Sequence, residues 1–305
     1  MSTSAKLPPS RLSGILFVLT SGCCWGFHGI LIKYALALGA SFLQIFLFEV
    51  LFATLFFGFF ARSFFLPVRP TKPSHWWSLV GIGLSVIGVG YFLFLAFSLG
   101  PVAIGATLMF MYLPVVYAYS LLARHQSFSI IKFASITLIL LGAVLTTEIL
   151  ASFKEPGTLP AIFAALVASM CYSVVFILTP GIAPYTTALF RSFSASLMGL
   201  VGTLVILAVT PKLWFPLGEN FWSIMGMAFI LAIVGQTLPV ITLMKGLPIT
   251  GSSLGGVLAS VELPIAVFSA VILLGESLNL FKFTGVALVL SGIILYNLRD
   301  RKREG

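Results

Sequence analysis

The chain has 305 residues, of which 59% are hydrophobic and 8% charged, with a mean hydropathy of +1.13 and a formal net charge of +9. A soluble domain carries about 25% charged residues, so this composition excludes a soluble enzyme or binding domain and indicates an integral membrane protein. The positive charge does not indicate nucleic-acid binding, because the basic residues stand between apolar segments, where they set membrane topology.

Ten apolar segments follow one another along the chain, and each is near the roughly 20 residues that a helix needs to cross a bilayer. The connections between them are short, so no separate soluble domain is expected. The sequence therefore predicts an all-α integral membrane protein, with spans at residues 13–37, 41–61, 76–98, 101–122, 129–146, 158–179, 182–208, 219–244, 250–273 and 280–298.

The first span could be mistaken for a signal peptide, because Lys6 and Arg11 precede it and Thr20-Ser21-Gly22-Cys23 weakly resembles a lipoprotein cleavage site. The apolar pattern continues past Thr20, so we expect the span to be retained. Deeper in the span, glycines allow close approach of a neighbouring helix.

Three ionisable residues lie inside later spans, where a charge costs about 2.5–3.5 kcal/mol and usually faces a partner or a cavity. They are Glu49, Arg191 and Glu262. At about 1.5 Å per residue, Arg191 is expected roughly 13 Å from the inner end of its helix and the two carboxylates roughly 18 Å from the inner side, so that all three share one slab. Segment 46–55 aligns with 188–197, which makes Glu49 and Arg191 equivalent positions.

Two interpretations of these residues stay open. Glu49 and Arg191 either form a buried ion pair that fixes helix register or take part in substrate or proton binding. Glu262 stands two residues before Pro264, so its carboxylate is either functional or satisfies backbone groups that the proline frees.

Further polar and aromatic residues are candidates for lining a central cavity, or alternatively for packing between helices. Trp25 and His28 share one face of the first span, because they are three residues apart. An imidazole changes charge near neutral pH, so His28 is a candidate for proton binding. With the ionisable residues, the substrate-binding or coupling candidates are Glu49, Arg191, Glu262, His28, Trp25, Tyr91, Tyr112, Tyr172 and Gln236.

One enzyme-like motif is present, Gly251-Ser252-Ser253-Leu254-Gly255, which fits G-x-S-x-G. In a nucleophile elbow this motif follows a strand, whereas here it starts an apolar span, so we expect small packing residues and no enzyme. An intramembrane serine protease that uses Ser253 and His28 is the rival hypothesis. No metal or cofactor site is expected, and a Walker A motif is absent. The cysteines, which we expect to pack as small residues, are Cys23, Cys24 and Cys171.

A repeat links the two halves of the chain. Residues 114–145 align without a gap with residues 264–295, and 8 of the 32 positions are identical, including Pro114/Pro264 and Lys132/Lys282. Five spans separate the copies, so the second copy must cross the bilayer upside down. The sequence therefore predicts ten transmembrane helices arranged as two inverted five-helix repeats, residues 13–146 and 158–298, which together form one transport unit.

The distribution of basic residues predicts the orientation. With both termini inside, the cytoplasmic side holds twelve Lys and Arg residues and the opposite side four, which obeys the positive-inside rule. The twelve are Lys6, Arg11, Arg62, Arg69, Lys72, Arg124, Lys132, Lys245, Arg299, Arg301, Lys302 and Arg303, and the four are Lys33, Lys154, Lys212 and Lys282.

Several motifs resemble those of the EamA-type transporters of the drug/metabolite transporter superfamily. They are Trp25-Gly26 and Lys33 in the first span, Arg191 in the seventh, and Val261-Glu262-Leu263-Pro264 followed by Gly275-Glu276-Ser277-Leu278, Gly285 and Gly292. The first half departs from the family pattern: Glu49 stands where an arginine is common, and Tyr112 replaces an acid. By the same resemblance, Glu276 is expected to pin the turn between the last two spans.

The resemblance implies a secondary transporter that works by alternating access in the inner (plasma) membrane. We expect an exporter of small metabolites, with amino acids or related polar metabolites first and drugs as a wider class. Its implied partners are a small-molecule substrate, the lipid bilayer, protons and a second copy of the chain as a homodimer. A membrane scaffold or sensor that transports nothing is the alternative, and it predicts a packed core without water access.

Overall fold

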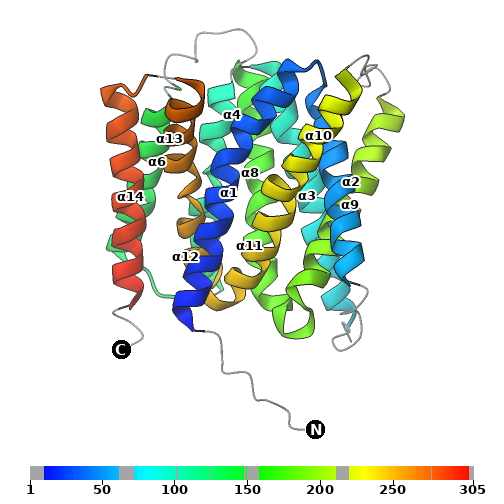
Figure 1. Cartoon of the computed structure of the whole chain (residues 1–305). Coiled ribbons are helices and arrows are strands. Elements are labelled where there is room, and N and C mark those ends of the chain that lie inside the picture. The colour runs from blue at the N-terminus through cyan, green and yellow to red at the C-terminus, as the bar shows by residue number, and fades with distance from the viewer. Residues whose placement is uncertain are drawn as a thin grey trace.

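The computed structural model describes residues 10–61, 72–100, 102–123, 125–147, 149, 158–210, 220–275 and 277–301. These residues form helices and no strand, and ten helical stretches are long and apolar enough to cross a membrane. The expectation of an all-α protein with ten spans is therefore confirmed. Figure 1 shows the helices running side by side between two ends of a bundle.

The first half contains α1 (Arg11–Ala37), α2 (Phe42–Ala61), α3 (Pro73–Leu99), α4 (Val102–Met109), α5 (Tyr112–Leu122) and α6 (Ile130–Thr147). The second half contains α8 (Thr158–Ile182), the 3-10 turn η1 (Ala183–Tyr185), α9 (Ala188–Val209), α10 (Phe221–Leu231), the π-helical segment η4 (Ala232–Thr237), α11 (Leu238–Thr250), α12 (Ser252–Ala259), α13 (Glu262–Leu274) and α14 (Leu280–Arg301).

The fourth and ninth spans are each broken into two helices at equivalent positions. The break after α4 and the break after α12 are 150 residues apart, the same offset as the sequence repeat. A proline explains each break, because it has no amide hydrogen for the carbonyl four residues earlier. Because Pro114 cannot donate to the Phe110 carbonyl, Leu113 N–H donates to it instead, at 3.0 Å. In the same way, Leu263 N–H donates to the Ser260 carbonyl, at 3.1 Å, because Pro264 cannot.

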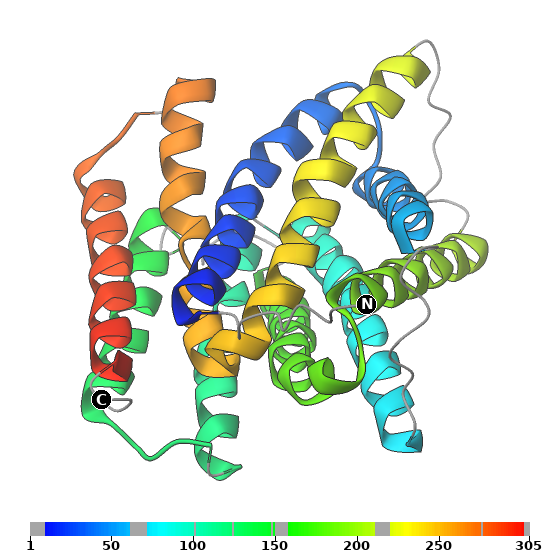
Figure 2. The same ribbon diagram turned by 60° about the horizontal axis from the view of Figure 1, so that its bottom comes forward.

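The packing of α6 against α14, which lie side by side in both ribbon views (Figure 1 and Figure 2), displays the inversion. A Cβ added at Gly142 would lie 2.6 Å from the Gly285 carbonyl oxygen, and one added at Gly292 would lie 2.7 Å from the Ser135 carbonyl oxygen. The two helices are thus antiparallel, although they are equivalent in the repeat. Under the offset of 150, the first contact maps onto the second, so the interface has a local two-fold axis, as the inverted repeat predicts.

Both ends of the helical part of the chain lie at the same end of the bundle (Figure 1). Arg11 at the start of α1 lies 3.0 Å from Asp300 near the end of α14, and the buried Lys132 at the start of α6 lies 2.5 Å from the other oxygen of Asp300. Lys282 is eighteen residues from Asp300, about 27 Å along α14. The repeat-equivalent residues Lys132 and Lys282 therefore lie at opposite ends, as expected.

The seventh span begins later than the sequence predicts. Residues 183–185 form a separate turn that contains Pro184, and α9 begins only at Ala188. Thr187 caps the new helix, because its hydroxyl accepts a hydrogen bond from Phe190 N–H at 3.1 Å. Arg191 consequently lies in the first turn of α9, about 4.5 Å from its start, so the expected distance of roughly 13 Å from the inner end of its helix is wrong.

Candidate functional site: an ionisable and aromatic cluster between the repeats

The centre of the candidate site is an ion pair between α1 and α2. His28 Nε2 lies 2.9 Å from Glu49 Oε1, and within the described part of the chain neither of these buried atoms has a hydrogen-bond partner. Glu49 is fully buried, whereas the His28 side chain keeps 19% of its surface exposed. Pairing with an imidazole offsets the cost of holding a carboxylate at this depth.

Gly235 makes room for this pair. It lies in η4, and a Cβ added there would overlap both His28 Nε2 and Glu49 Oε1. Only glycine lets the backbone of the eighth span approach the pair so closely. A π-helical turn within a helix is often found at a functional site.

Trp25 joins the same segment to α1. Pro239 stands four residues after Gly235 and has no amide hydrogen, so the Gly235 carbonyl lacks the donor that a regular helix would supply. Trp25 Nε1–H supplies one instead, at 2.8 Å. The sequence reasoning missed Gly235; the available signal was a glycine four residues before a proline inside a span.

Trp25 also belongs to an aromatic cluster shared by both halves of the chain. Its ring meets Tyr172 edge-on at 5.9 Å between centroids, and Tyr172 meets Tyr112 edge-on at 4.9 Å. Phe176 stacks on Tyr112 at 4.9 Å. The Tyr112 hydroxyl donates to the Gly256 carbonyl at 2.8 Å. Trp25 and Tyr172 are half-buried, while Tyr112 and Phe176 are buried behind them.

Glu262 completes the site from α13. It interacts electrostatically with His28, Tyr112 and Tyr172. Its carboxylate has no hydrogen bond and no ion pair with any other residue that the structure describes. The side chain is only partly buried and keeps accessible surface.

Two glycines set the depth of Glu262. Gly22 packs against the Ala259 carbonyl, and Gly26 packs against the Glu262 carbonyl, where an added Cβ would lie 2.8 Å and 2.9 Å from the respective oxygens. This close packing of α1 on the break between α12 and α13 agrees with the expected role of small residues. Because Gly26 lies between Trp25 and His28, Glu262 is held at the level of both side chains.

Arg191 lies elsewhere, and the ion pair with Glu49, one of the two interpretations left open by the sequence, is not formed. Its Nη1 donates to the Thr186 carbonyl at 2.7 Å, and its Nη2 donates to the Met244 carbonyl at 2.5 Å. The neighbouring Phe193 packs at the level of Gly58 on α2, nine residues or about 14 Å beyond Glu49. Pro248 stands four residues after Met244, so Arg191 supplies a donor that the proline lacks.

The remaining candidates are less closely connected to the pair. Gln236 is half-buried in η4, next to Gly235. Tyr91 is half-buried on α3 and meets Phe92 edge-on at 5.3 Å. Glu276, which the resemblance assigns to the last turn, lies outside the described residues.

The contacts of Ser253 do not support the protease hypothesis. Ser253 Oγ lies 2.5 Å from the Tyr296 hydroxyl, while His28 pairs with Glu49. The serine and the imidazole are therefore not partners. Within the described residues no three His, Cys, Asp or Glu side chains could hold a metal ion, and the three cysteines are free.

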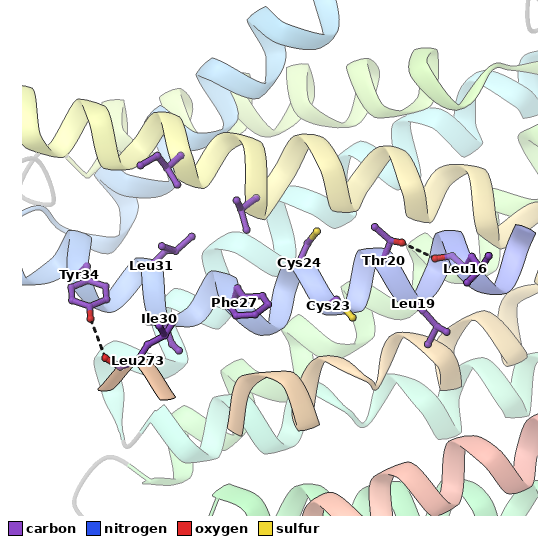
Figure 3. Close-up of a pocket in the computed structure, with 12 residues that line it drawn as sticks. Leu16, Leu19, Thr20, Cys23, Cys24, Phe27, Ile30, Leu31, Tyr34 and Leu273 are labelled. Atoms are coloured by element: carbon purple, nitrogen blue, oxygen red, sulfur yellow. Dashed lines mark hydrogen bonds between the residues drawn. The ribbon is translucent and has the colours of Figure 1, made fainter. Parts of the chain in front are cut away.

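A separate groove of about 600 Å³ lies between α1, the α10–η4 region and the end of α13 (Figure 3). Figure 3 shows Cys23, Cys24, Phe27 and Leu31 along α1, and Tyr34 donating to the Leu273 carbonyl, at 3.5 Å, at one end of the groove. Its lining is almost entirely apolar, and Leu16, Phe27 and Leu273 are exposed. An apolar surface of this kind suits contact with lipid chains. We therefore assign polar ligand binding to the side of α1 that carries His28.

Comparisons with known proteins agree with this architecture. The model of the EamA-like transporter family matches residues 12–148 and again residues 159–298. A solved crystal structure of a protein superposes with a TM-score of 0.74 at 18% identity and covers 95% of this chain and 98% of its own. At that identity the likeness shows the fold alone. No curated protein sequence matches the chain.

Proposed function

The chain belongs to the EamA-like transporter family, and from this premise we propose that it moves a small metabolite across the membrane by alternating access. It is a multi-pass membrane protein of a transporter family with ten spans. The observation that carries the proposal is the His28–Glu49 pair, which lies beside Glu262 and the half-buried rings of Trp25 and Tyr172. A solvated ionisable cluster between inverted repeats is typical of a transporter's substrate site.

In this proposal the two halves work as one transport unit. Residues from α1 and α2 of the first half meet residues from α8, η4 and α13 of the second, so either half alone lacks part of the site. The helix breaks before Tyr112 and Glu262 and the π-helical turn at Gly235 provide three places beside the site where a helix can bend. Bending there would open the site to one side and then to the other.

Orientation, direction and coupling also belong to the proposal. Both termini are cytoplasmic in the inner membrane, on the strength of the twelve-to-four distribution of basic residues. Protons couple transport through His28, Glu49 and Glu262. Export is the direction that we propose, with amino acids and related polar metabolites as the first class to test and drugs as the wider one.

Water access to the site tests the proposal directly. Cys23, Cys24 and Cys171 are replaced by serine, and single cysteines are introduced as His28→Cys and Gln236→Cys. A membrane-impermeant thiol reagent is then applied to right-side-out and to inverted vesicles. Alternating access predicts labelling of both positions from each side, because the population exchanges between states.

The matched control is Phe59→Cys, at an outward side chain that is 78% exposed and would face hydrocarbon. It should resist the same reagent. If His28→Cys and Gln236→Cys resist it from both sides in correctly inserted protein, the core is sealed, and the scaffold or sensor hypothesis replaces transport.

A further inference from the structure

The charge of the site favours a cation. Two carboxylates and one imidazole lie at its centre, and Glu49 is already paired with His28. Glu262 has no ion-pair partner among the described residues. Arg191, the residue that could have received a substrate carboxylate, donates to the backbone oxygens of Thr186 and Met244 instead. A positively charged group on a ligand would balance the charge of an ionised Glu262 carboxylate.

The aromatic rings beside Glu262 suit the same ligand. The half-buried rings of Trp25 and Tyr172 meet edge-on, and hydrogen bonding of Trp25 to Gly235 fixes one of them. Tyr112 and Phe176 support Tyr172 from behind at 4.9 Å and 5.0 Å between centroids. The faces of such rings attract ammonium groups, and their edges offer apolar contact to an organic body. These contacts hold the rings of Trp25 and Tyr172 in place before a ligand binds.

We propose that this site binds an organic cation, a protonated amine or quaternary ammonium joined to an apolar body, with its charge beside Glu262 and its body against Trp25 and Tyr172. The inference rests on the proposed transport function and names the substrate class. It narrows the earlier expectation of amino acids to compounds whose positive charge is not accompanied by a carboxylate.

The test compares matched amines and carboxylates on the purified full-length protein in detergent. Three pairs of probes share their apolar bodies: tryptamine with indole-3-propionate, phenethylamine with 3-phenylpropionate, and hexylamine with hexanoate. Affinities are measured by isothermal titration calorimetry. We expect at least one amine to bind about tenfold or more tightly than its carboxylate partner. Equal or tighter binding of the carboxylates, or no binding by any amine, overturns the inference.

Two variants locate the binding. Glu262→Gln keeps the size of the side chain and removes its charge, and it should weaken amine binding by about tenfold or more. The control is Glu155→Gln, which removes a carboxylate from the connection between two predicted spans and should leave affinity unchanged. If Glu262→Gln fails to fold, the comparison of probes on the wild-type protein still decides.

The outcome separates this inference from the proposed function. If no amine binds the wild-type protein, but single cysteines at positions 28 and 236 react with the water-soluble reagent, the cation inference is overturned and transport still stands. Amine binding that depends on Glu262, in a protein that moves none of the bound amines in proteoliposomes, supports the cation site and counts against transport.

Discussion

Arg191 donates a hydrogen bond of 2.5 Å to the carbonyl oxygen of Met244, a carbonyl that Pro248 leaves without its usual helical donor. A similar hydrogen bond occurs in the same span, where Trp25 donates to the carbonyl oxygen of Gly235, four residues before Pro239. Each proline thus creates a free acceptor inside the bundle, and a side chain from another helix satisfies it. The eighth span is tied to α9 and to α1 in this way.

The first prediction concerns Arg191. Arg191→Met leaves the buried carbonyls of Thr186 and Met244 without this donor, at a cost of about 1–3 kcal/mol each. In a Pro248→Ala background the cost should be smaller, because the amide hydrogen gained at position 248 can bond to Met244. Thermal unfolding of the four proteins in detergent measures this coupling. Strictly additive losses would contradict the assignment of Arg191 to backbone support.

The second prediction applies the same comparison of single and double variants to Trp25 and Pro239. Trp25→Phe keeps a ring against Tyr172 and removes the donor to Gly235, so it should destabilise the protein by about 1 kcal/mol. Pro239→Ala should reduce that loss, because it restores an amide hydrogen to the helix. The Pro248→Ala variant is the control, since its amide lies next to Met244. An equal rescue by both alanine variants would refute the pairing.

The third prediction concerns space at the ion pair. Gly235→Ala places a Cβ on His28 and Glu49, so it should separate the pair and abolish proton-driven transport while the protein remains in the membrane. Gly226→Ala, in α10 of the same span, has nothing within 4 Å of the added atom and should retain transport. Flux in proteoliposomes checks both. Full activity of Gly235→Ala would show that the close approach is not needed.

Length and hydropathy were sufficient to predict the ten spans, and the offset between Pro114 and Pro264 was sufficient to predict the inversion. The partner of Glu49 was not predictable in the same way. Equivalent residues of an inverted repeat are related by a two-fold axis in the membrane plane, so they share a depth only when both lie at the depth of that axis. Glu49 and Arg191 are equivalent in sequence and lie at different depths, and this is why the ion-pair interpretation does not hold.

The close approach of Gly235 to His28 and Glu49 could not be predicted from the sequence either. Its π-helical turn depends on where Trp25, His28 and Glu49 meet the eighth span, and those contacts come from three separate helices. A periodic pattern along one span reports which residues are apolar, but it does not report which neighbour each will contact.

The fourth prediction tests the two-fold interface between α6 and α14. Gly142→Ala and Gly292→Ala each push a Cβ against a backbone oxygen of the facing helix, so each should cost about 1–3 kcal/mol, and the two losses should be similar. Gly181→Ala, with open space around its added atom, should leave the midpoint of thermal unfolding unchanged or raise it slightly. Very unequal losses at positions 142 and 292 would argue against the local symmetry.

The fifth prediction concerns His28 and Glu49 as a unit. The two side chains are 2.9 Å apart, and Glu49 is fully buried, so removing either one leaves the other without its partner. His28→Gln, Glu49→Gln and the double variant should therefore lose proton-driven transport to a similar extent, because a pair that acts together gives strongly non-additive losses. Exchange of substrate in the absence of a proton gradient is the second readout, and it should survive in all three variants. A double variant much worse than either single one, or loss of exchange together with proton-driven flux, would show that the pair supports binding or folding and does not couple protons.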